Sequence, residues 1–400
     1  MARKALFIMP EVITYQNVVC MNKDVMAKEA IYLIQTYKRQ PLVIAKGKGA
    51  IVWDISGKEY IDCIAGIAVN NVGHCHPKVV SAIKKQAERL IHTSNLYYTE
   101  VQVELAEKIA SLTRLDKVFF CNSGTEAVEA ALKLARKASE KTDFIAADGS
   151  FHGRSMGALS VTSKERYRKS FEPLIPGVKF VPYDDAEAIK NSITPKTAAI
   201  ILEPIQGEGG VNVPSDGYLR AVREICDDAD ILLIFDEVQT GFGRTGRWFA
   251  SMHWGVQPDI MVLAKAMAGG FPMGAMVAKE SVAKKFQSGD HASTFGGDPL
   301  ACAASLGAIE ALEDGLVDRS EKLGKYFLEK LGELRHDYIK EIRGKGLMIG
   351  MELAMDGSSI VDKARDRGVL LNCISETVLR FAPPLVITKE QIDRVVEVLG

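Results

Sequence analysis

Short runs of consecutive apolar residues alternate with longer amphipathic stretches between residues 100 and 280. Within these runs the apolar residues are adjacent and do not alternate with polar ones, which indicates strands covered on both faces. Strands of that kind, separated by helices, are typical of a mostly parallel sheet in an α/β fold. The predicted strands are Lys117–Cys121, Phe144–Ala147, Lys179–Pro182, Ala198–Leu202, Ile231–Phe235, Ile260–Leu263 and Met273–Ala278.

The chain before this region has a different pattern. Residues 41–64 contain two β-rich runs, and Ser56-Gly57-Lys58 between Ile51–Asp54 and Tyr60–Cys63 predicts a hairpin turn. Pro77–His92 has apolar residues at helical spacing and is predicted to be a helix. Residues 1–28 have no clear period, so we interpret them as an N-terminal arm.

The pattern changes again after residue 300, where helical stretches surround short strands and indicate a second, smaller α+β domain. We expect residues 1–75 to form an N-terminal arm and a segment that joins the small domain. Residues 76–299 would form a large domain, and residues 300–400 the C-terminal small domain. The predicted helices here are Leu300–Glu313, Arg319–Leu334, Ile360–Arg367 and Lys389–Leu399, and the strands are Ile339–Arg343, Leu347–Glu352, Val369–Asn372 and Val378–Phe381.

Composition narrows the class of protein. There are 50 Lys and Arg residues against 51 Asp and Glu residues, which gives a formal charge of −1. Nucleic-acid-binding proteins and proteins that dock on anionic membranes normally have a basic excess, and this chain has none. Hydrophobic residues make up 47% and charged residues 25% of the chain, as in an ordinary soluble globular protein.

The seven cysteines are scattered and include no CxxC pair, so we expect neither a disulfide framework nor a structural zinc site. Scattered free cysteines are typical of a reducing compartment. No apolar run approaches the roughly 18 residues of a transmembrane helix. Residues 5–10 are too short for the core of a signal peptide, so we expect a cytoplasmic protein.

Candidate chemistry gathers where the predicted strands end, and ligands of open α/β sheets bind at the carboxyl ends of strands. Ser123-Gly124-Thr125 follows the first strand, and Ser123 with Glu126 three residues later forms a capping-box pattern. Gly124 lets the backbone approach a ligand, and the start of a helix attracts anions, so this turn predicts a phosphate cradle. Taken alone, the same pattern also fits an ordinary helix cap.

Phe151, His152 and Arg154 follow the second strand, in the sequence GSFHGR. A buried arginine between glycines would suit a carboxylate through bidentate pairing. Phe151 offers a flat face on which a ring can stack. For His152 and Phe151, taken alone, a packed loop explains the pattern better.

Asp236 ends an entirely apolar strand, and a buried carboxylate is costly unless it meets a cation. Lys265 follows another apolar strand and precedes Gly269-Gly270; a desolvated lysine has a lowered pKa and attacks carbonyls readily. A phosphate cradle, an aromatic platform, a buried aspartate and such a lysine together fit pyridoxal 5′-phosphate. A nicotinamide cofactor would need a GxGxxG loop, and we find none.

The order of these motifs resembles that of the class III aminotransferases, a branch of the aspartate-aminotransferase-like fold (fold type I). The resemblance covers about residues 40–400 and implies a large domain with a mostly parallel seven-stranded sheet plus a small α+β domain. The matching segments are GIAVNNVGHCHP (66–77), NSGTEA (122–127), FHGR (151–154), EPIQGEGG (203–210), DEVQTGFGRTG (236–246), LAKAMAGGFPMGA (263–275) and STFGGDPLAC (293–302).

The resemblance implies a role for each matching residue toward pyridoxal 5′-phosphate. Lys265 would bind the cofactor covalently and shuttle a proton, and Asp236 would keep the ring nitrogen protonated. Gln239 would bind the ring hydroxyl. The other implied cofactor contacts are Phe151 and Val238 on the two ring faces, His152 beside the ring, Ser123, Gly124 and Thr125 at the phosphate, and Thr294 at the phosphate of the neighbouring subunit of a homodimer.

Implied substrate contacts are Arg154, Glu208, Ser293 and Arg380. Arg154 would bind a distal carboxylate, and Arg380 the α-carboxylate of glutamate or 2-oxoglutarate. Glu208 would pair with Arg380 whenever the substrate has no carboxylate there, because an unpaired buried charge costs several kcal/mol. Ser293 would contact the substrate in the neighbouring subunit. The histidines of HCH (74–76) have no further ligands at sensible spacing, so no metal site is expected.

Within the family, three segments are similar to the acetylornithine group: 92–108, 343–353 and 368–393. Ile67 occupies the position of a tyrosine that grips free ornithine in ornithine aminotransferases, so an aliphatic residue disfavours that substrate. We expect N-acetylornithine and 2-oxoglutarate to give N-acetylglutamate 5-semialdehyde and glutamate, in arginine biosynthesis. The alternatives are 4-aminobutyrate or another ω-amine as donor, a glutamate-semialdehyde aminomutase, and a protein that binds the cofactor without catalysis.

Overall fold

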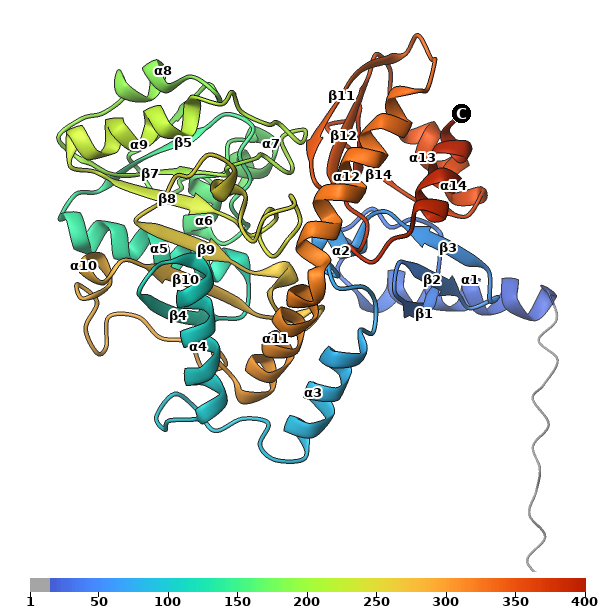
Figure 1. The fold of residues 1–400 in the computed structure, drawn as a ribbon, viewed down its shortest axis with the longest axis horizontal. Coiled ribbons are helices and arrows are strands. Elements are labelled where there is room, and N and C mark those ends of the chain that lie inside the picture. Colours follow the sequence, from blue (N-terminus) through green and yellow to red (C-terminus); the bar gives the residue numbers. More distant parts are fainter. Residues whose placement is uncertain (1–14) are drawn as a thin grey trace, which may run out of the picture.

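A seven-stranded sheet forms the centre of the larger lobe in the computed structural model, which describes residues 15–400 (Figure 1). The strand order is β4-β10-β9-β8-β7-β5-β6. All these strands are parallel except β10, which runs antiparallel to both of its neighbours. The strands are β4 (Lys117–Cys121), β5 (Asp143–Ala147), β6 (Val178–Val181), β7 (Thr197–Leu202), β8 (Leu232–Asp236), β9 (Ile260–Leu263) and β10 (Gly274–Ala278).

The prediction of a mostly parallel seven-stranded sheet is therefore confirmed, with strand ends displaced by at most one residue. The central strands β7, β9 and β10 are buried along their whole length, as continuous apolar runs require. Helix α5 (Gly124–Ser139) packs its alanine-rich face on β7, β8, β9 and β10. Small side chains on that face allow the helix to lie close to the sheet.

The N-terminal part of the described chain begins with helix α1 (Tyr15–Tyr32), in the region that we interpreted as an N-terminal arm. Residues 1–14 of that predicted arm lie outside the described residues. The predicted hairpin is confirmed: β2 (Ile51–Asp54) pairs antiparallel with β3 (Glu59–Asp62). β1 (Ile44–Lys48) lies on the other side of β2, and β13 (Val369–Leu370) pairs with β3 from the far end of the chain.

The smaller lobe contains a second four-stranded sheet with the order β11-β12-β15-β14, beside helices from the C-terminal quarter of the chain (Figure 1). The predicted strand Val369–Asn372 is wrong, because the chain divides there between β13 and β14, which belong to different sheets. The elements are α11 (Pro299–Ala311), α12 (Val317–Gly332), β11 (Ile339–Lys345), β12 (Met348–Leu353), α13 (Ser358–Asp366), β14 (Asn372–Ile374), β15 (Val378–Phe381) and α14 (Lys389–Leu399).

The remaining helices are short or lie at the surface. Helix α3 ends at Ala87, five residues before the end we predicted. No helix in residues 15–400 has both the length and the apolar character that crossing a membrane requires. The helices not yet named are α2 (Ala65–Ala68), α3 (Pro77–Ala87), α4 (Glu100–Thr113), α6 (Met156–Ser160), α7 (Glu165–Arg168), α8 (Ala186–Lys190), α9 (Tyr218–Ala229) and α10 (Glu280–Ala283). The single-turn or irregular segments are η1 (Lys169–Phe171), η2 (Ala250–His253), η3 (Lys265–Ala268) and η4 (Leu312–Leu316).

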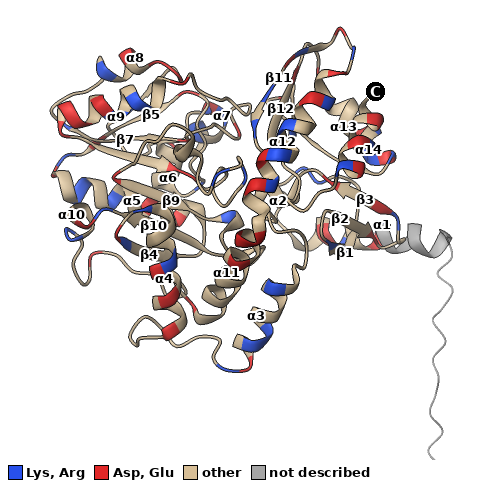
Figure 2. Ribbon diagram, viewed as in Figure 1, with Lys and Arg blue, Asp and Glu red and all other residues tan. Residues whose placement is uncertain are grey.

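Acidic and basic side chains are mixed along the outer helices, such as α4 and α12, in keeping with the near-zero net charge (Figure 2). Charge also occurs in the interior, at the joint between the lobes. Arg244 Nη1 donates to the carbonyl oxygens of Leu347 at 2.8 Å and Pro383 at 2.6 Å. Its Nη2 donates to Asn71 Oδ1 at 2.5 Å. One buried arginine thus connects the N-terminal, central and C-terminal parts of the chain.

Candidate active site

A cavity of about 480 Å³ opens at the carboxyl ends of β4, β5, β8 and β9. Because these strands are parallel, the residues that follow them meet at one edge of the sheet. The cavity brings together most of the residues singled out in the sequence. Its lining includes Ser123, Gly124, Thr125, Phe151, His152, Arg154, Asp236, Val238 and Lys265.

Lys265 is the first residue of η3, after β9 and the extended residue Ala264. Its φ of 47° is in the left-handed region, which a side chain other than glycine rarely adopts, and such strain concentrates at functional sites. Burial lowers the pKa of Lys265, while the charge of Glu208 opposes the shift. Within the described chain its ammonium group has no hydrogen-bond or ion-pair partner. A lysine in this setting is a ready nucleophile toward a carbonyl.

Asp236 is buried at the end of β8, and both of its carboxylate oxygens accept hydrogen bonds. Oδ2 lies 2.7 Å from His152 Nδ1, and Oδ1 accepts from the backbone N–H of Val238 at 3.0 Å. The ring of His152 is itself buried, and its Nε2 has no partner among the residues described. His152 therefore forms a hydrogen bond with Asp236. The sequence analysis placed His152 beside the cofactor ring and did not predict this contact.

The predicted phosphate cradle forms the N-terminus of α5. Ser123 is the N-cap, and its Oγ accepts from the N–H of Glu126 at 3.4 Å. The predicted capping box is only half formed, because the carboxylate of Glu126 accepts instead from the backbone and side chain of Asn122. A side chain at Gly124 would place its Cβ 2.9 Å from a methyl group of Val238. Glycine is thus required for this close approach.

Thr125, the last residue of the cradle, is fixed from behind by a polar chain. Its Oγ1 lies 2.6 Å from Ser155 Oγ, which in turn donates to Glu129 at 2.5 Å. Glu129 also accepts from the backbone N–H groups of Gly157 and Ala158. The N–H groups in the first turn of a helix have no acceptor within it, so the start of α5 can bind an anion.

Glu208, Arg380 and Gln239 form a second group beside the cavity. Arg380 is only 1% exposed, and its Nη1 donates to Glu208 Oε1 and, at 3.1 Å, to Gln239 Oε1. Burial would raise the pKa of Glu208, but the charges of Arg380 and Lys265 outweigh it and hold the pKa below its ordinary value. Arg380 Nη2 is buried without a partner in the described chain, so it can still donate.

The prediction that Arg154 is buried is wrong. Its side chain is exposed, and its guanidinium lies over the ring of Tyr167, 3.6 Å from the centroid. The neighbouring glycine does lie in a narrow space: a Cβ on Gly153 would lie 2.8 Å from Thr125 Cβ. Arg154 itself lines the cavity as an exposed residue.

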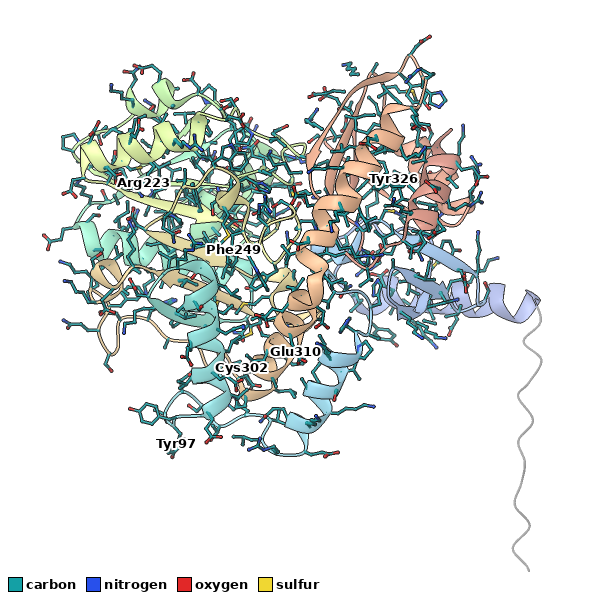
Figure 3. The ribbon with its side chains drawn as sticks, in the orientation of Figure 1. Tyr97, Arg223, Phe249, Cys302, Glu310 and Tyr326 are labelled. Atoms are coloured by element: carbon teal, nitrogen blue, oxygen red, sulfur yellow. The ribbon has the colours of Figure 1, made fainter. Side chains whose placement is uncertain are left out.

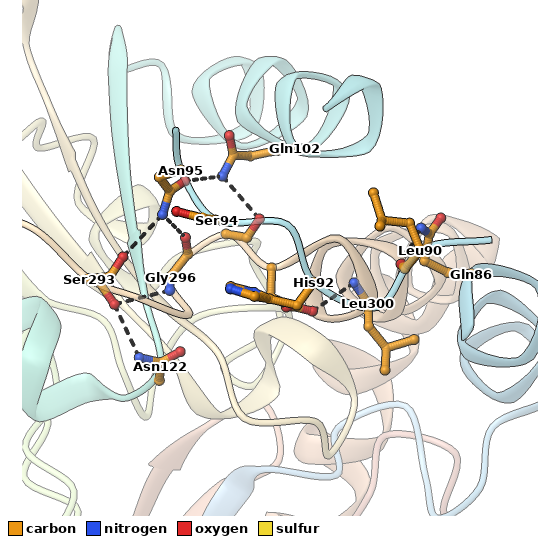
Figure 4. A network of polar contacts seen from close by, with 12 residues as sticks. Gln86, Leu90, His92, Ser94, Asn95, Gln102, Asn122, Ser293, Gly296 and Leu300 are labelled. Atoms are coloured by element: carbon orange, nitrogen blue, oxygen red, sulfur yellow. Dashed lines mark hydrogen bonds and ion pairs between the residues drawn. The ribbon is translucent and has the colours of Figure 1, made fainter. Parts of the chain in front are cut away.

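Ser293 and Thr294 do not line the cavity that contains Lys265; each lines a different one. Ser293 accepts from Asn122 at 3.3 Å through its Oγ and from Asn95 at 3.1 Å through its carbonyl oxygen (Figure 4). Their implied roles in a neighbouring subunit stay predictions. In the part of the chain that the structure describes, no cluster of three His, Cys, Asp or Glu side chains could hold a metal ion.

Glu203 is a buried residue of the site to which the sequence analysis gave no role. It follows β7 and accepts from the backbone N–H groups of Phe151 at 3.0 Å and Gly207 at 2.9 Å. Burial raises its pKa to about 7; His152 opposes the shift and Asp236 adds to it. The signal was available, because a carboxylate directly after an apolar strand is the same pattern that singled out Asp236.

These residues fit pyridoxal 5′-phosphate. Lys265 presents an unpartnered amine to the cavity, the start of α5 offers N–H groups to a phosphate, and buried Asp236 suits a protonated ring nitrogen. Val238 and Phe151 line the same cavity and provide apolar surface for a ring. The cradle is closed by Gly124 and Gly153, where a Cβ would collide with neighbouring side chains.

Comparison with known proteins agrees with this geometry. Residues 33–400 match the family model described as aminotransferase class-III. An acetylornithine aminotransferase from Methanosarcina mazei is 62% identical over 94% of this chain and 95% of its own length. Among solved structures, the ornithine aminotransferase from Toxoplasma gondii superimposes with a TM-score of 0.92 at 39% identity, covering 98% of this chain and 97% of that one. An acetylornithine aminotransferase from Elizabethkingia anophelis gives 0.85 at 35%, over 94% and 97%. The chain belongs to the class III aminotransferases, which use pyridoxal 5′-phosphate.

Proposed function

We propose that this aminotransferase moves the δ-amino group of N-acetylornithine to 2-oxoglutarate, giving N-acetylglutamate 5-semialdehyde and glutamate in two half-reactions. The observation that carries the proposal is the ion pair between buried Arg380 and half-buried Glu208, whose charges act on Lys265. The names of the similar acetylornithine aminotransferases support the choice of donor. The reaction would be a step of arginine biosynthesis.

Bound pyridoxal 5′-phosphate supplies a ring that withdraws electrons from the carbon that loses its proton. We assign Lys265 to holding the cofactor and moving that proton, since burial lowers its pKa and so favours the neutral amine. Asp236, fixed by His152 and Val238, would keep the ring nitrogen protonated. Ser123, Gly124 and Thr125 would hold the phosphate, and Phe151, Val238 and Gln239 would orient the ring.

The two substrates differ in charge where they meet Arg380. In the glutamate half-reaction an α-carboxylate would pair with Arg380 and displace Glu208. In the N-acetylornithine half-reaction the reacting amine carries no carboxylate there, and Glu208 would neutralise Arg380. The lowered pKa of Glu208 supports this assignment, because it keeps the carboxylate charged and ready to pair. Arg154 would bind the distal carboxylate of the amine.

Ile67 supports an acylated donor over free ornithine. It lies in the turn Ala65–Ala68, in which all residues have positive φ, and is 43% exposed. A β-branched residue at φ 64° is a genuine outlier, and strained positions of this kind concentrate at functional sites. An aliphatic side chain offers no hydrogen bond to a free α-amino group.

We further propose a homodimer in the cytoplasm, with Ser293 and Thr294 completing the site of the partner. Support for the dimer comes from the loop between α3 and α4, where Leu96 is 83%, Tyr97 67% and Tyr98 99% exposed. Tyr97 is labelled in Figure 3. Support for a reducing compartment comes from the free thiols of the described cysteines. We also propose the division into residues 1–75, 76–299 and 300–400, with the cofactor bound mainly by the second.

A panel of amines tests the donor. With 2-oxoglutarate as acceptor, N-acetylornithine should give the highest kcat/KM among N-acetylornithine, ornithine and 4-aminobutyrate. A faster reaction with either competitor would overturn the choice of substrate. Turnover of glutamate semialdehyde without any 2-oxo acid would favour the aminomutase.

Lys265→Ala tests the chemistry. It should remove the absorption band of the imine between the lysine and the cofactor and lower kcat by about 10⁴-fold, because the residue that moves the proton is lost. Lys284→Ala, at an exposed lysine after α10, is the matched control and should behave as the wild type. Normal turnover by Lys265→Ala would contradict the mechanism.

A further inference from the structure

Arg154 lines the cavity but is held there by aromatic rings instead of by an acid. Its guanidinium carbon lies 3.6 Å from the centroid of the Tyr167 ring and 5.5 Å from that of Phe151. Among residues 15–400, no carboxylate forms an ion pair with it. A cation is attracted to the face of an aromatic ring, so these contacts localise the charge without neutralising it.

Tyr167 is itself fixed on helix α7 (Glu165–Arg168). Its ring meets Phe151 edge to face, with centroids 6.1 Å apart and an interplanar angle of 85°. Its hydroxyl accepts from Arg166 Nη2 at 2.9 Å, and its side chain is half-buried. Phe151 lines the same cavity as Arg154. The Tyr167 ring is therefore packed against a ring of the cavity wall, and both rings contact the guanidinium of Arg154.

Stacking on a ring has a specific consequence for an arginine. The guanidinium is planar, and its N–H donors point outward in that plane. When a ring occupies the face, the edge stays free for a bidentate contact with a carboxylate. An ion pair would instead occupy the edge, as Glu208 does at Arg380.

We propose that Tyr167 is a positioning residue for substrate recognition: its ring holds Arg154 at the cavity rim with its donor edge free for the distal carboxylate of the amine substrate. This inference rests on the proposed function, in which Arg154 binds that carboxylate. Without the ring, the exposed Arg154 side chain would sample many rotamers and lose entropy when it binds substrate. The benefit of Tyr167 should therefore depend on the carboxylate.

The test compares two amines in the holoenzyme: N-acetylornithine and its decarboxylated analogue, N-acetyl-1,4-diaminobutane. Tyr167→Leu should lower kcat/KM for N-acetylornithine roughly three- to tenfold, mainly through KM, as expected for loss of one cation–π contact. For the analogue the change should stay within about twofold. Tyr167→Phe retains the ring and should behave as the wild type. Phe171→Leu, at an exposed aromatic residue in the next segment, is the matched control.

A double variant identifies the residue through which Tyr167 acts. In an Arg154→Met background, Tyr167→Leu should have no further effect, because there is no guanidinium to position. Equal losses on the two amines, or a full effect of Tyr167→Leu in that background, would overturn the inference and indicate a general packing role. If Arg154→Met itself lowers activity equally with both amines, Arg154 does not bind the carboxylate, and both its proposed role and this inference fail. A selective loss in Arg154→Met with none in Tyr167→Leu overturns this inference alone.

Discussion

Arg244, at the joint between the lobes, and Arg380, at the edge of the active site, are both almost completely inaccessible, with 0% and 1% exposure, but they have different kinds of hydrogen-bond partner. Arg244 donates to two carbonyl oxygens and one side-chain amide, and burial lowers its pKa to about 9. Arg380 donates to the carboxylate of Glu208 and keeps one terminal nitrogen without a partner in the described chain. The first arginine has permanent partners, and the second an exchangeable one.

Two glutamates of the site, buried Glu203 and half-buried Glu208, repeat this contrast. Glu203 accepts from the backbone N–H groups of Phe151 and Gly207, which cannot move away independently. Glu208 is paired with a side chain. Their pKa values shift in opposite directions, upward for Glu203 because of burial and downward for Glu208, where Arg380 and Lys265 outweigh burial. Backbone partners suit a group that holds the fold, whereas a charged side-chain partner suits a group that must exchange with a substrate carboxylate.

The largest effect should come from removing Arg244, the arginine whose hydrogen-bond partners are permanent. Arg244→Met would leave the carbonyls of Leu347 and Pro383 and the Asn71 amide oxygen buried without donors, each at a penalty of about 1–3 kcal/mol. We expect unfolding free energy to fall by roughly 3–5 kcal/mol, measured by urea denaturation of the holoenzyme.

The control for this variant is Arg247→Met, which removes a surface ion pair with Glu321 and should change stability by less than about 1 kcal/mol. A similar small change for Arg244→Met would show that the joint does not depend on the buried arginine. Arg244 could then no longer be contrasted with Arg380 as an arginine that stabilises the fold.

Removing Arg380, the arginine whose partner is exchangeable, should affect catalysis more than folding. Arg380→Ala deletes the partner of the α-carboxylate, so kcat/KM for 2-oxoglutarate should fall roughly 10²–10³-fold, as for a lost buried charge pair. The N-acetylornithine half-reaction should fall less than about tenfold, since there Arg380 only pairs with Glu208. Single-turnover measurements of each half-reaction separate the two.

Equal losses in both half-reactions would contradict the exchange between Glu208 and the substrate. The corresponding control is Arg319→Ala, an arginine of α12 that donates to the carbonyls of Leu385 and Ile387 outside the cavity. It should leave the ratio of the half-reactions unchanged.

The sequence predicted the strands and the residues at their ends, but neither the direction of side chains nor the partners of Arg244. Apolar runs that end in polar residues predicted the strands of the large sheet to within one residue, and hence the shared edge that holds Lys265 and Asp236. Whether a side chain points inward was not predictable: Arg154 is exposed, and its guanidinium lies over the ring of Tyr167, a contact known only in three dimensions. Arg244 was also missed, since its partners are more than 100 residues away in the sequence on both sides.

Glu203 should make the free energy of unfolding depend on pH. A carboxyl with a native pKa near 7 instead of 4.5 binds its proton more tightly when folded, so its contribution to stability is full below pH 4.5 and is lost as pH rises toward 7. Glu203→Gln stays neutral, so stability of the wild type relative to the variant should fall by roughly 2 kcal/mol between pH 5 and 8. Glu329→Gln, on the exposed face of α12, should leave the wild-type slope intact. A slope unchanged in Glu203→Gln would mean that another group titrates there.

Glu208→Gln should give the smallest effect, in the ratio of the two half-reactions. Glutamine keeps an acceptor for Arg380 but no charge, so the pair weakens without a change of shape. A weaker pair is easier for 2-oxoglutarate to displace and neutralises Arg380 less well when N-acetylornithine reacts. We therefore expect the specificity ratio to shift roughly tenfold toward 2-oxoglutarate, an effect equivalent to about 1.4 kcal/mol. A shift toward N-acetylornithine, or loss of both half-reactions without a change in ratio, would contradict this expectation. Glu208 would then stabilise the fold as Glu203 does, and it would not be an exchangeable partner of Arg380.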